Sequence, residues 1–183
     1  PGASGALLLA LGLLAGPGDE VLMADPGYPC NRHFAGFCAA RAVAIPVGAE
    51  TAYQLNLDLI ERHASPATRV VLIASPSNPT GTLITHTELA RIHEWCLAND
   101  VALIVDEIYL ALTYDGEEHS AAVWDDVFVI NSFSKYFLMT GWRLGWLVAP
   151  RWALDGLERL AQNLYLAAPT PAQHSALTAF SAE

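Results

Sequence analysis

Basic residues are scarce in this chain of 183 residues. It contains 9 Lys and Arg residues against 19 Asp and Glu residues, which gives a formal net charge of −10 at pH 7. A surface with this charge repels the phosphate backbones of DNA and RNA. The composition therefore argues against direct binding of nucleic acid by this segment.

Several common motifs are missing. The three cysteines, Cys30, Cys38 and Cys96, cannot all pair with one another, and no two of them form a CxxC motif. The six histidines form no HExxH motif, and the chain has no GxxxxGK[ST] or GxGxxG sequence. These absences argue against a metal site and against the commonest nucleotide-binding loops. Free thiols are typical of a reducing compartment, so we expect a cytoplasmic protein.

Long apolar runs are also absent. The strongest candidate, residues 6–15, is shorter than the roughly 20 residues that a helix needs to cross a bilayer. No Lys or Arg precedes this run, so it lacks the positive region of a signal peptide. We expect a buried helix here and no association with a membrane.

What the chain does contain is a regular alternation of apolar strands and helical segments. Its length and its 53% apolar content suffice for one domain with a real core. We expect strands at residues 20–24, 42–47, 69–74, 101–105, 127–131 and 144–149. We expect helices at residues 2–14, 31–40, 57–64 and 152–166, one that follows a capping box at Thr85–Glu88, and a last one from Ala172 onward. This alternation predicts an α/β fold with an open, mostly parallel sheet.

Polar residues follow three of the expected strands. Asn78, Asp106 and Ser132 each come within a few residues of the end of an apolar strand. In open α/β sheets, ligands bind beyond the carboxyl ends of the strands. The sequence therefore predicts that these side chains converge on one rim of the sheet.

Three sequence blocks carry a family resemblance. They are Ser75–Gly81 (SPSNPTG), Asp106–Tyr109 (DEIY), and Ser132–Lys135 (SFSK), which is followed by Thr140–Gly145 (TGWRLG). In this order they resemble the class I/II aminotransferases, which are enzymes of fold type I that use pyridoxal 5'-phosphate. The resemblance implies that residues 1–183 form an aminotransferase-like three-layer α/β/α large domain, which binds the cofactor. Family members extend beyond both ends of such a segment, and the arginine that binds the substrate carboxylate lies outside it.

The resemblance also implies a role for each candidate residue around the cofactor ring. Lys135 would hold the cofactor as a Schiff base and later move a proton, and Asp106 would pair with the pyridine nitrogen. Tyr109 and Asn78 would donate to the phenolic oxygen, and Tyr28 would stack on the ring. Taken alone, these residues also fit ordinary structural roles, such as an exposed lysine, a turn aspartate or a half-buried tyrosine.

A phosphate site is expected beside them. The Gly2–Gly5 turn, which includes Ala3 and Ser4, opens a helix whose free N–H groups favour an anion. Ser132 and Arg143 would complete the site, because a guanidinium offers a forked, charged contact to phosphate.

The expected function is amino-group transfer between an amino acid and a 2-oxo acid by a homodimeric enzyme. A lyase or decarboxylase of fold type I is the close alternative, because such enzymes share the cofactor residues. A further alternative is the sensor domain of a transcriptional regulator, in which the same fold binds the cofactor and amino acids. The motifs quoted do not separate these three possibilities.

Overall fold

A six-stranded sheet forms the centre of the molecule. We describe it from a computed structural model, which covers residues 1–114 and 118–180. The strands are β1 (Glu20–Asp25), β2 (Arg41–Pro46), β3 (Thr68–Ala74), β4 (Ala102–Asp106), β5 (Phe128–Ser132) and β6 (Gly145–Val148). Their order in the sheet is β2-β1-β3-β4-β5-β6; all neighbours pair in parallel except β5 and β6, which are antiparallel. The expected mostly parallel sheet is thus confirmed.

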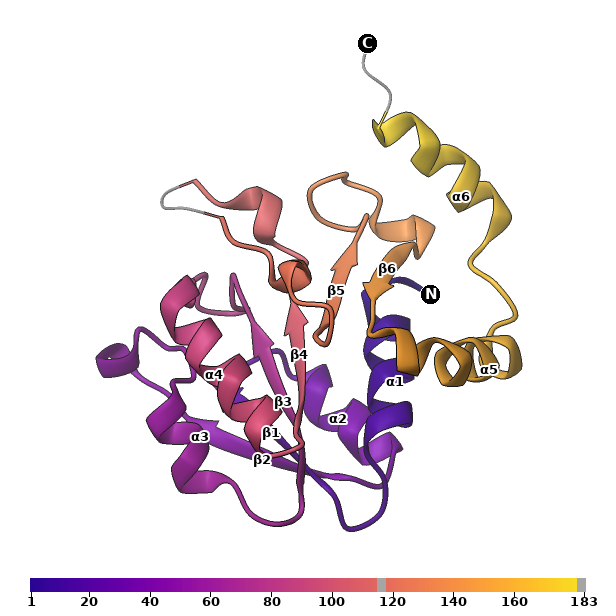
Figure 1. Ribbon diagram of the computed structural model, residues 1–183. Helices are drawn as coiled ribbons and strands as arrows, with labels where there is room; N and C mark the ends of the chain where they lie inside the picture. Colours follow the sequence, from indigo (N-terminus) through magenta and orange to yellow (C-terminus); the bar gives the residue numbers. More distant parts are fainter. Residues whose placement is uncertain (115–117, 181–183) are drawn as a thin grey trace.

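Helices cover both faces of this sheet (Figure 1). One face carries α1 (Gly2–Leu14), α2 (Cys30–Phe37) and α5 (Leu154–Leu164), and the other carries α3 (Leu57–His63) and α4 (His86–Ala98). The last helix, α6 (Thr170–Leu177), extends beyond α5 near the C-terminal end. Short 3₁₀ turns lie at Ala49–Thr51, Leu110–Leu112, Ala121–Val123, Thr140–Trp142, Arg151–Ala153 and Thr178–Phe180. The result is the three-layer α/β/α arrangement that the sequence predicts.

The strands are apolar on both faces because each face has its own core. In β3, Val70 and Leu72 belong to the core under α1, whereas Val71 and Ile73 belong to the core under α3 and α4. Successive side chains of a strand point to opposite faces, so an uninterrupted apolar run can fill both cores.

Helix α1 is the apolar run at the start of the chain. Leu7, Ala10 and Leu11 are buried, and the helix packs against β5, β6 and α5. It is a core helix of 13 residues. Within residues 1–114 and 118–180, no helix is both long and apolar enough to span a membrane.

Two local predictions need correction. Thr85 Oγ1 accepts from the Glu88 N–H (3.2 Å), but the Glu88 carboxylate accepts from the Leu57 N–H at the start of α3 (2.7 Å), so only half of the capping box forms. Glu88 therefore joins two helices. The last helix begins at Thr170, because Pro171 is tolerated within a first turn, where its missing N–H has no helical partner.

Candidate active site

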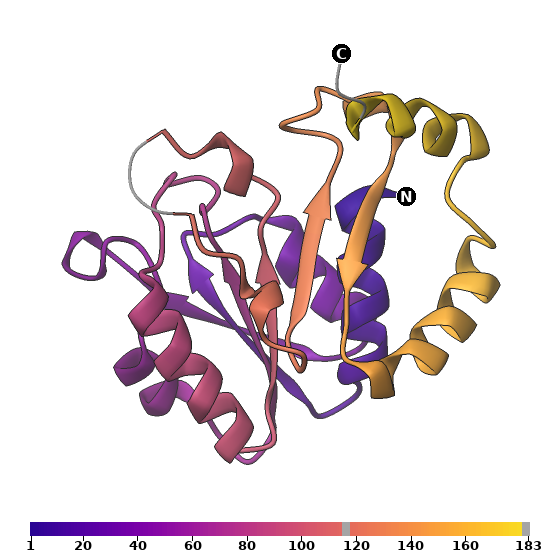
Figure 2. The same cartoon turned by 45° about the horizontal axis from the view of Figure 1, so that its top comes forward.

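The loops that follow β3, β4 and β5 begin at the same rim of the sheet. Ala74 is the register partner of Asp106, and Asp106 is the partner of Ile130. The Ser75 N–H donates to Asp106 O (3.1 Å) and the Glu107 N–H donates to Ile130 O (2.8 Å), which holds the loop starts together. The N-terminus of α1 lies at this same end of the sheet (Figure 2).

A cavity of about 100 Å³ lies at this rim. Most of the predicted site residues line it: Ala3, Ser4, Tyr28, Asn78, Asp106, Tyr109 and Lys135. The rest of the lining comes from Leu7, Ala74, Pro76 and Ile108. They come from α1, from the turn after β1, and from the loops after β3, β4 and β5. Residues far apart in the chain are therefore brought to one small space.

Lys135 and Tyr109 lie against each other at the cavity. Lys135 Nζ lies 5.5 Å from the centroid of the Tyr109 ring, and the lysine is only partly buried. The turn that carries the lysine is closed by a hydrogen bond from the Leu138 N–H to Lys135 O (2.9 Å). The amine is thus directed over an aromatic face and remains accessible from the cavity.

Asp106 is the buried acid of the cavity, with 6% of its surface exposed. Burial raises the pKa of Asp106 to about 6; the Ile108 N–H, which donates to Oδ1 (3.1 Å), opposes this shift, and the neighbouring Glu107 adds to it. In the part of the chain that the structure describes, no Lys, Arg or His forms an ion pair with this carboxylate. A cation bound in the cavity would supply the missing partner.

The adjacent carboxylate, Glu107, has a different environment. It accepts from the Ala121 N–H (2.6 Å) and from the Ser120 hydroxyl (2.8 Å), and it does not line the cavity. Burial also raises the pKa of Glu107, against the lowering effect of these two donors. Glu107 therefore fastens the loop after β4 and leaves Asp106 to face the cavity.

The N-terminus of α1 and Arg143 form a positively charged corner. Arg143 Nη2 lies within 2.9 Å of where a Cβ on Gly2 would stand, and Arg143 Nη1 donates to Thr140 O (2.7 Å) and to Ser134 Oγ (3.4 Å). Gly145 lets the start of α1 lie close against β5 and β6, since a Cβ there would lie 2.7 Å from Asn131 O and 3.0 Å from Ala3 N. A guanidinium beside free helical N–H groups suits an anion.

The comparisons with known proteins agree with this geometry. A family model described as aminotransferase class I and II matches residues 1–183. The chain belongs to this family. It is 42% identical to the valine–pyruvate aminotransferase of Mycobacterium tuberculosis, over 100% of this chain and 47% of that protein. It is 36% identical to an arginine–pyruvate transaminase of Pseudomonas aeruginosa, over 99% of this chain and 47% of that protein.

Solved structures of this family have the same fold. An aminotransferase from Mycobacterium tuberculosis superposes with a TM-score of 0.92 at 42% identity, covering 98% of this chain and 50% of that one. An aromatic aminotransferase from Pyrococcus horikoshii gives a TM-score of 0.94 at 30% identity, covering 100% of this chain and 50% of that one. The predicted family and the predicted fold are both confirmed. The chain spans about half the length of the curated relatives that it matches.

Two of the predicted site residues of this family member do not line the cavity. The Ser132 hydroxyl donates to Leu144 O (3.2 Å) and accepts from the Ser134 N–H (3.0 Å), so the turn itself uses its hydrogen bonds. Arg143 lies beside the cavity and lines a neighbouring groove next to α1 and β6. The Ser134 hydroxyl accepts a hydrogen bond from the Arg143 guanidinium (3.4 Å).

Sequence reasoning missed some residues of the site. Ile108 lines the cavity and supplies the N–H that holds Asp106, and Pro76 lines it beside Asn78. Their places within the DEIY and SPSNPTG blocks were the available signal, because both blocks follow strands that end at the rim.

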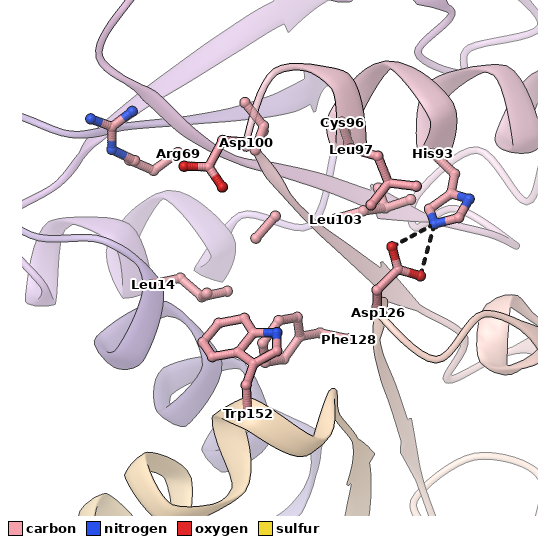
Figure 3. Close-up of a pocket in the computed structure, with 12 residues that line it drawn as sticks. Leu14, Arg69, His93, Cys96, Leu97, Asp100, Leu103, Asp126, Phe128 and Trp152 are labelled. Atoms are coloured by element: carbon pink, nitrogen blue, oxygen red, sulfur yellow. Dashed lines mark hydrogen bonds and ion pairs between the residues drawn. The ribbon is translucent and has the colours of Figure 1, made fainter.

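Another pocket, of about 250 Å³, lies by the amino ends of β3, β4 and β5, opposite the rim that carries the cavity (Figure 3). His93 Nε2 contacts both Asp126 carboxylate oxygens there, at 2.9 and 3.0 Å. Burial raises the pKa of the Cys96 thiol to about 12, with a smaller contribution from Asp126, so this cysteine is a poor nucleophile. None of the predicted site residues lies in this pocket. Among the residues described, no group of three or more His, Cys, Asp or Glu side chains could hold a metal ion.

Proposed function

We propose that this chain forms the pyridoxal-phosphate-binding part of an aminotransferase, which moves an amino group between an amino acid and a 2-oxo acid. One observation carries the proposal: the Lys135 amine and the buried Asp106 carboxylate line the same cavity. Residues 1–183 are proposed to belong to the large domain that binds the cofactor. The fold and the family membership support this assignment.

The residues of the cavity fit the groups of this cofactor. A pyridine nitrogen that carries a proton is the cation that Asp106 lacks, and the charge of Asp106 would keep that proton in place. Tyr109 and Asn78 would donate to the phenolic oxygen, and Tyr28 would lie against the ring. Lys135 would form the covalent bond to the cofactor through its amine and, once released by a substrate, would carry a proton from the substrate α-carbon. When bound, the cofactor supplies an acceptor for the electron pair that this proton leaves behind.

The phosphate would bind at the positively charged corner. The N–H groups of Ala3 and Ser4 at the start of α1, together with the Ser4 hydroxyl, are its proposed donors. Arg143 would turn toward it from its contacts with Thr140 and Ser134. Ser132 would reach the phosphate only by giving up its bond to Leu144 O.

Transamination is favoured over the other reactions of this cofactor. The two relatives compared above are named as an aminotransferase and a transaminase, which gives no support to a lyase, a decarboxylase or a regulator. Their names differ in the amino donor and agree on pyruvate, so we propose pyruvate as the first acceptor to assay.

A homodimer in the cytoplasm is the proposed setting. In the segment that follows Lys135, Tyr136, Leu138 and Trp142 expose 53%, 87% and 44% of their surfaces, and these are side chains that a second subunit could cover. Cys30, Cys38 and Cys96 are free thiols, in keeping with a reducing compartment.

The test is covalent trapping of the cofactor. We expect the protein mixed with pyridoxal phosphate to develop a visible absorption band, and borohydride to fix the cofactor on the peptide that contains Lys135, as read by mass spectrometry. The variant Lys135→Ala should bind cofactor without a trapped adduct. An adduct on the terminal α-amine only, or no adduct on folded protein, would overturn the assignment.

A further inference from the structure

Gln54 is a buried amide that the proposed reaction does not use. It lies between the Ala49–Thr51 turn and α3, far in sequence from every residue of the cavity, and only 6% of its surface is exposed. Its side-chain Nε2 donates to Thr82 O (2.7 Å) and to Ala74 O (3.2 Å). Both acceptors belong to the segment that carries Asn78.

These two carbonyls mark the base of the loop. Ala74 is the last residue of β3 and the register partner of Asp106, and Thr82 lies where the chain returns after the Asn78 turn. Asn78 stands midway between them in the sequence. The Gln54 amide therefore joins the first residue and the last residue of this loop segment, Ala74 and Thr82, at the point where the loop leaves the sheet.

The rest of the loop depends on the same carbonyl. Thr82 O also accepts from the Ser77 N–H (2.9 Å), and the Gly81 N–H donates to Ser77 O (2.7 Å), which closes the turn around Asn78. At the exit, Ser75 Oγ accepts from the Ile84 N–H (3.1 Å). Gln54 holds Thr82 O, and Thr82 O holds the N–H of Ser77, the residue directly before Asn78. Gln54 therefore also influences the direction from which Asn78 enters the cavity.

We propose that Gln54 is a positioning residue, which sets the position of the Asn78 amide at the cofactor through the hydrogen bonds that its side chain donates to Ala74 and Thr82 at the base of the loop. The proposal rests on the proposed function, since Asn78 matters only if the cofactor binds beside it. Removing the amide leaves Ala74 O without its side-chain donor and frees Thr82 O to move. A displaced hydrogen bond in a binding site loses most of its value.

The experiment is a double-mutant cycle on the affinity of the whole protein for pyridoxal phosphate. We expect Gln54→Met, which keeps the length but has no donor, to weaken binding about three- to tenfold, and Asn78→Ala to weaken it by a similar or larger factor. In the Asn78→Ala background, Gln54→Met should have almost no further effect. Independent, multiplying losses would overturn the proposal.

A second readout does not depend on the cofactor. In cofactor-free protein, amide hydrogen exchange at Ser77 and Gly81 should become faster in Gln54→Met. The matched control is Asn56→Ala, which removes the cap on the Leu59 N–H at α3 and leaves the loop bonds intact. It should lower stability without changing either readout; equal changes in both variants would show that Gln54 acts through general stability.

If Gln54→Met does not fold, Ser75→Ala, which cuts the exit of the same loop at Ile84, should show the same coupling to Asn78. Additive effects of Ser75→Ala would then count against the proposal. Failure of the unmodified protein to bind pyridoxal phosphate would overturn the proposed function, and this inference with it.

Discussion

The burial of Asp106 predicts that the site is a source of instability in the cofactor-free protein. Its pKa is raised from the ordinary value of 3.8 to about 6, chiefly by desolvation. Each pKa unit corresponds to about 1.4 kcal/mol, so ionised Asp106 lowers the free energy of unfolding by on the order of 3 kcal/mol. The change Asp106→Asn removes the charge and keeps an oxygen for the Ile108 N–H.

The sign of the pH dependence follows from the two pKa values. Between pH 4 and 6 the folded carboxyl binds a proton that the unfolded one does not, so the unfolded state binds fewer protons and stability falls as the pH rises. Above pH 6 the whole cost is present, and below pH 4 it is absent. We expect Asp106→Asn to be more stable than the unmodified protein by on the order of 3 kcal/mol at pH 8, and nearly equal to it at pH 4.

Urea unfolding of cofactor-free protein at the two pH values measures this difference. The burial of Glu107 is common to both proteins, and its repulsion of Asp106 is already part of the raised pKa of Asp106. Asp58→Asn, on the surface in the first turn of α3, serves as the control and should change stability by less than about 0.5 kcal/mol. A variant no more stable at pH 8, or a gain of equal size at both pH values, would refute the reasoning. Added pyridoxal phosphate should reduce or reverse the stability advantage of Asp106→Asn at pH 8, because its protonated pyridine nitrogen would pair with the Asp106 carboxylate of the unmodified protein.

Two further predictions concern the positively charged corner. Arg143→Gln should weaken the binding of pyridoxal phosphate roughly 10- to 100-fold and leave the binding of pyridoxal, which has no phosphate, almost unchanged; equal losses for both ligands would contradict a phosphate contact. Gly145→Ala should destabilise the protein by about 1–3 kcal/mol in thermal unfolding, because the new Cβ would meet backbone atoms of Asn131 and Ala3 that cannot turn aside. Gly36→Ala in α2, where a Cβ would meet nothing within 4 Å, is the matched control, and a loss of the same size there would remove the steric explanation.

The sequence predicted the sheet and most of the cavity for one physical reason. Runs such as Val70–Ile73 are apolar on both faces, which is stable only for a strand covered on both sides, and parallel strands covered in this way end at a common rim. Asn78 and Asp106 lie at or just after the ends of such strands and line the cavity, whereas Ser132, the third residue expected to converge there, does not line it. The convergence of Asn78 and Asp106 therefore depends on local distance from a strand end, which the sequence contains.

The contacts that the sequence did not predict join segments that lie far apart in the chain and meet only in the folded protein. The Ser132 hydroxyl is used by Leu144 O, which arrives only because β6 pairs with β5 in antiparallel. Glu88 bonds the start of α3 because α3 and α4 lie side by side. Gln54 gains its partners only after β3 and its loop have formed. No local pattern marks any of these contacts.

The neighbouring residues Asp106 and Glu107 show where stability and the proposed function diverge. Both are buried, and they are consecutive in the chain. Glu107 accepts from Ser120 and Ala121, whereas the Ile108 N–H is the one donor to Asp106 among the residues that the structure describes, and Asp106 faces the cavity. A second donor to Asp106 would remove part of the cost of its burial, but it would also satisfy the charge before a pyridine nitrogen could. The incomplete hydrogen bonding of Asp106 is therefore the feature of the fold that best fits a site built to be completed by its cofactor.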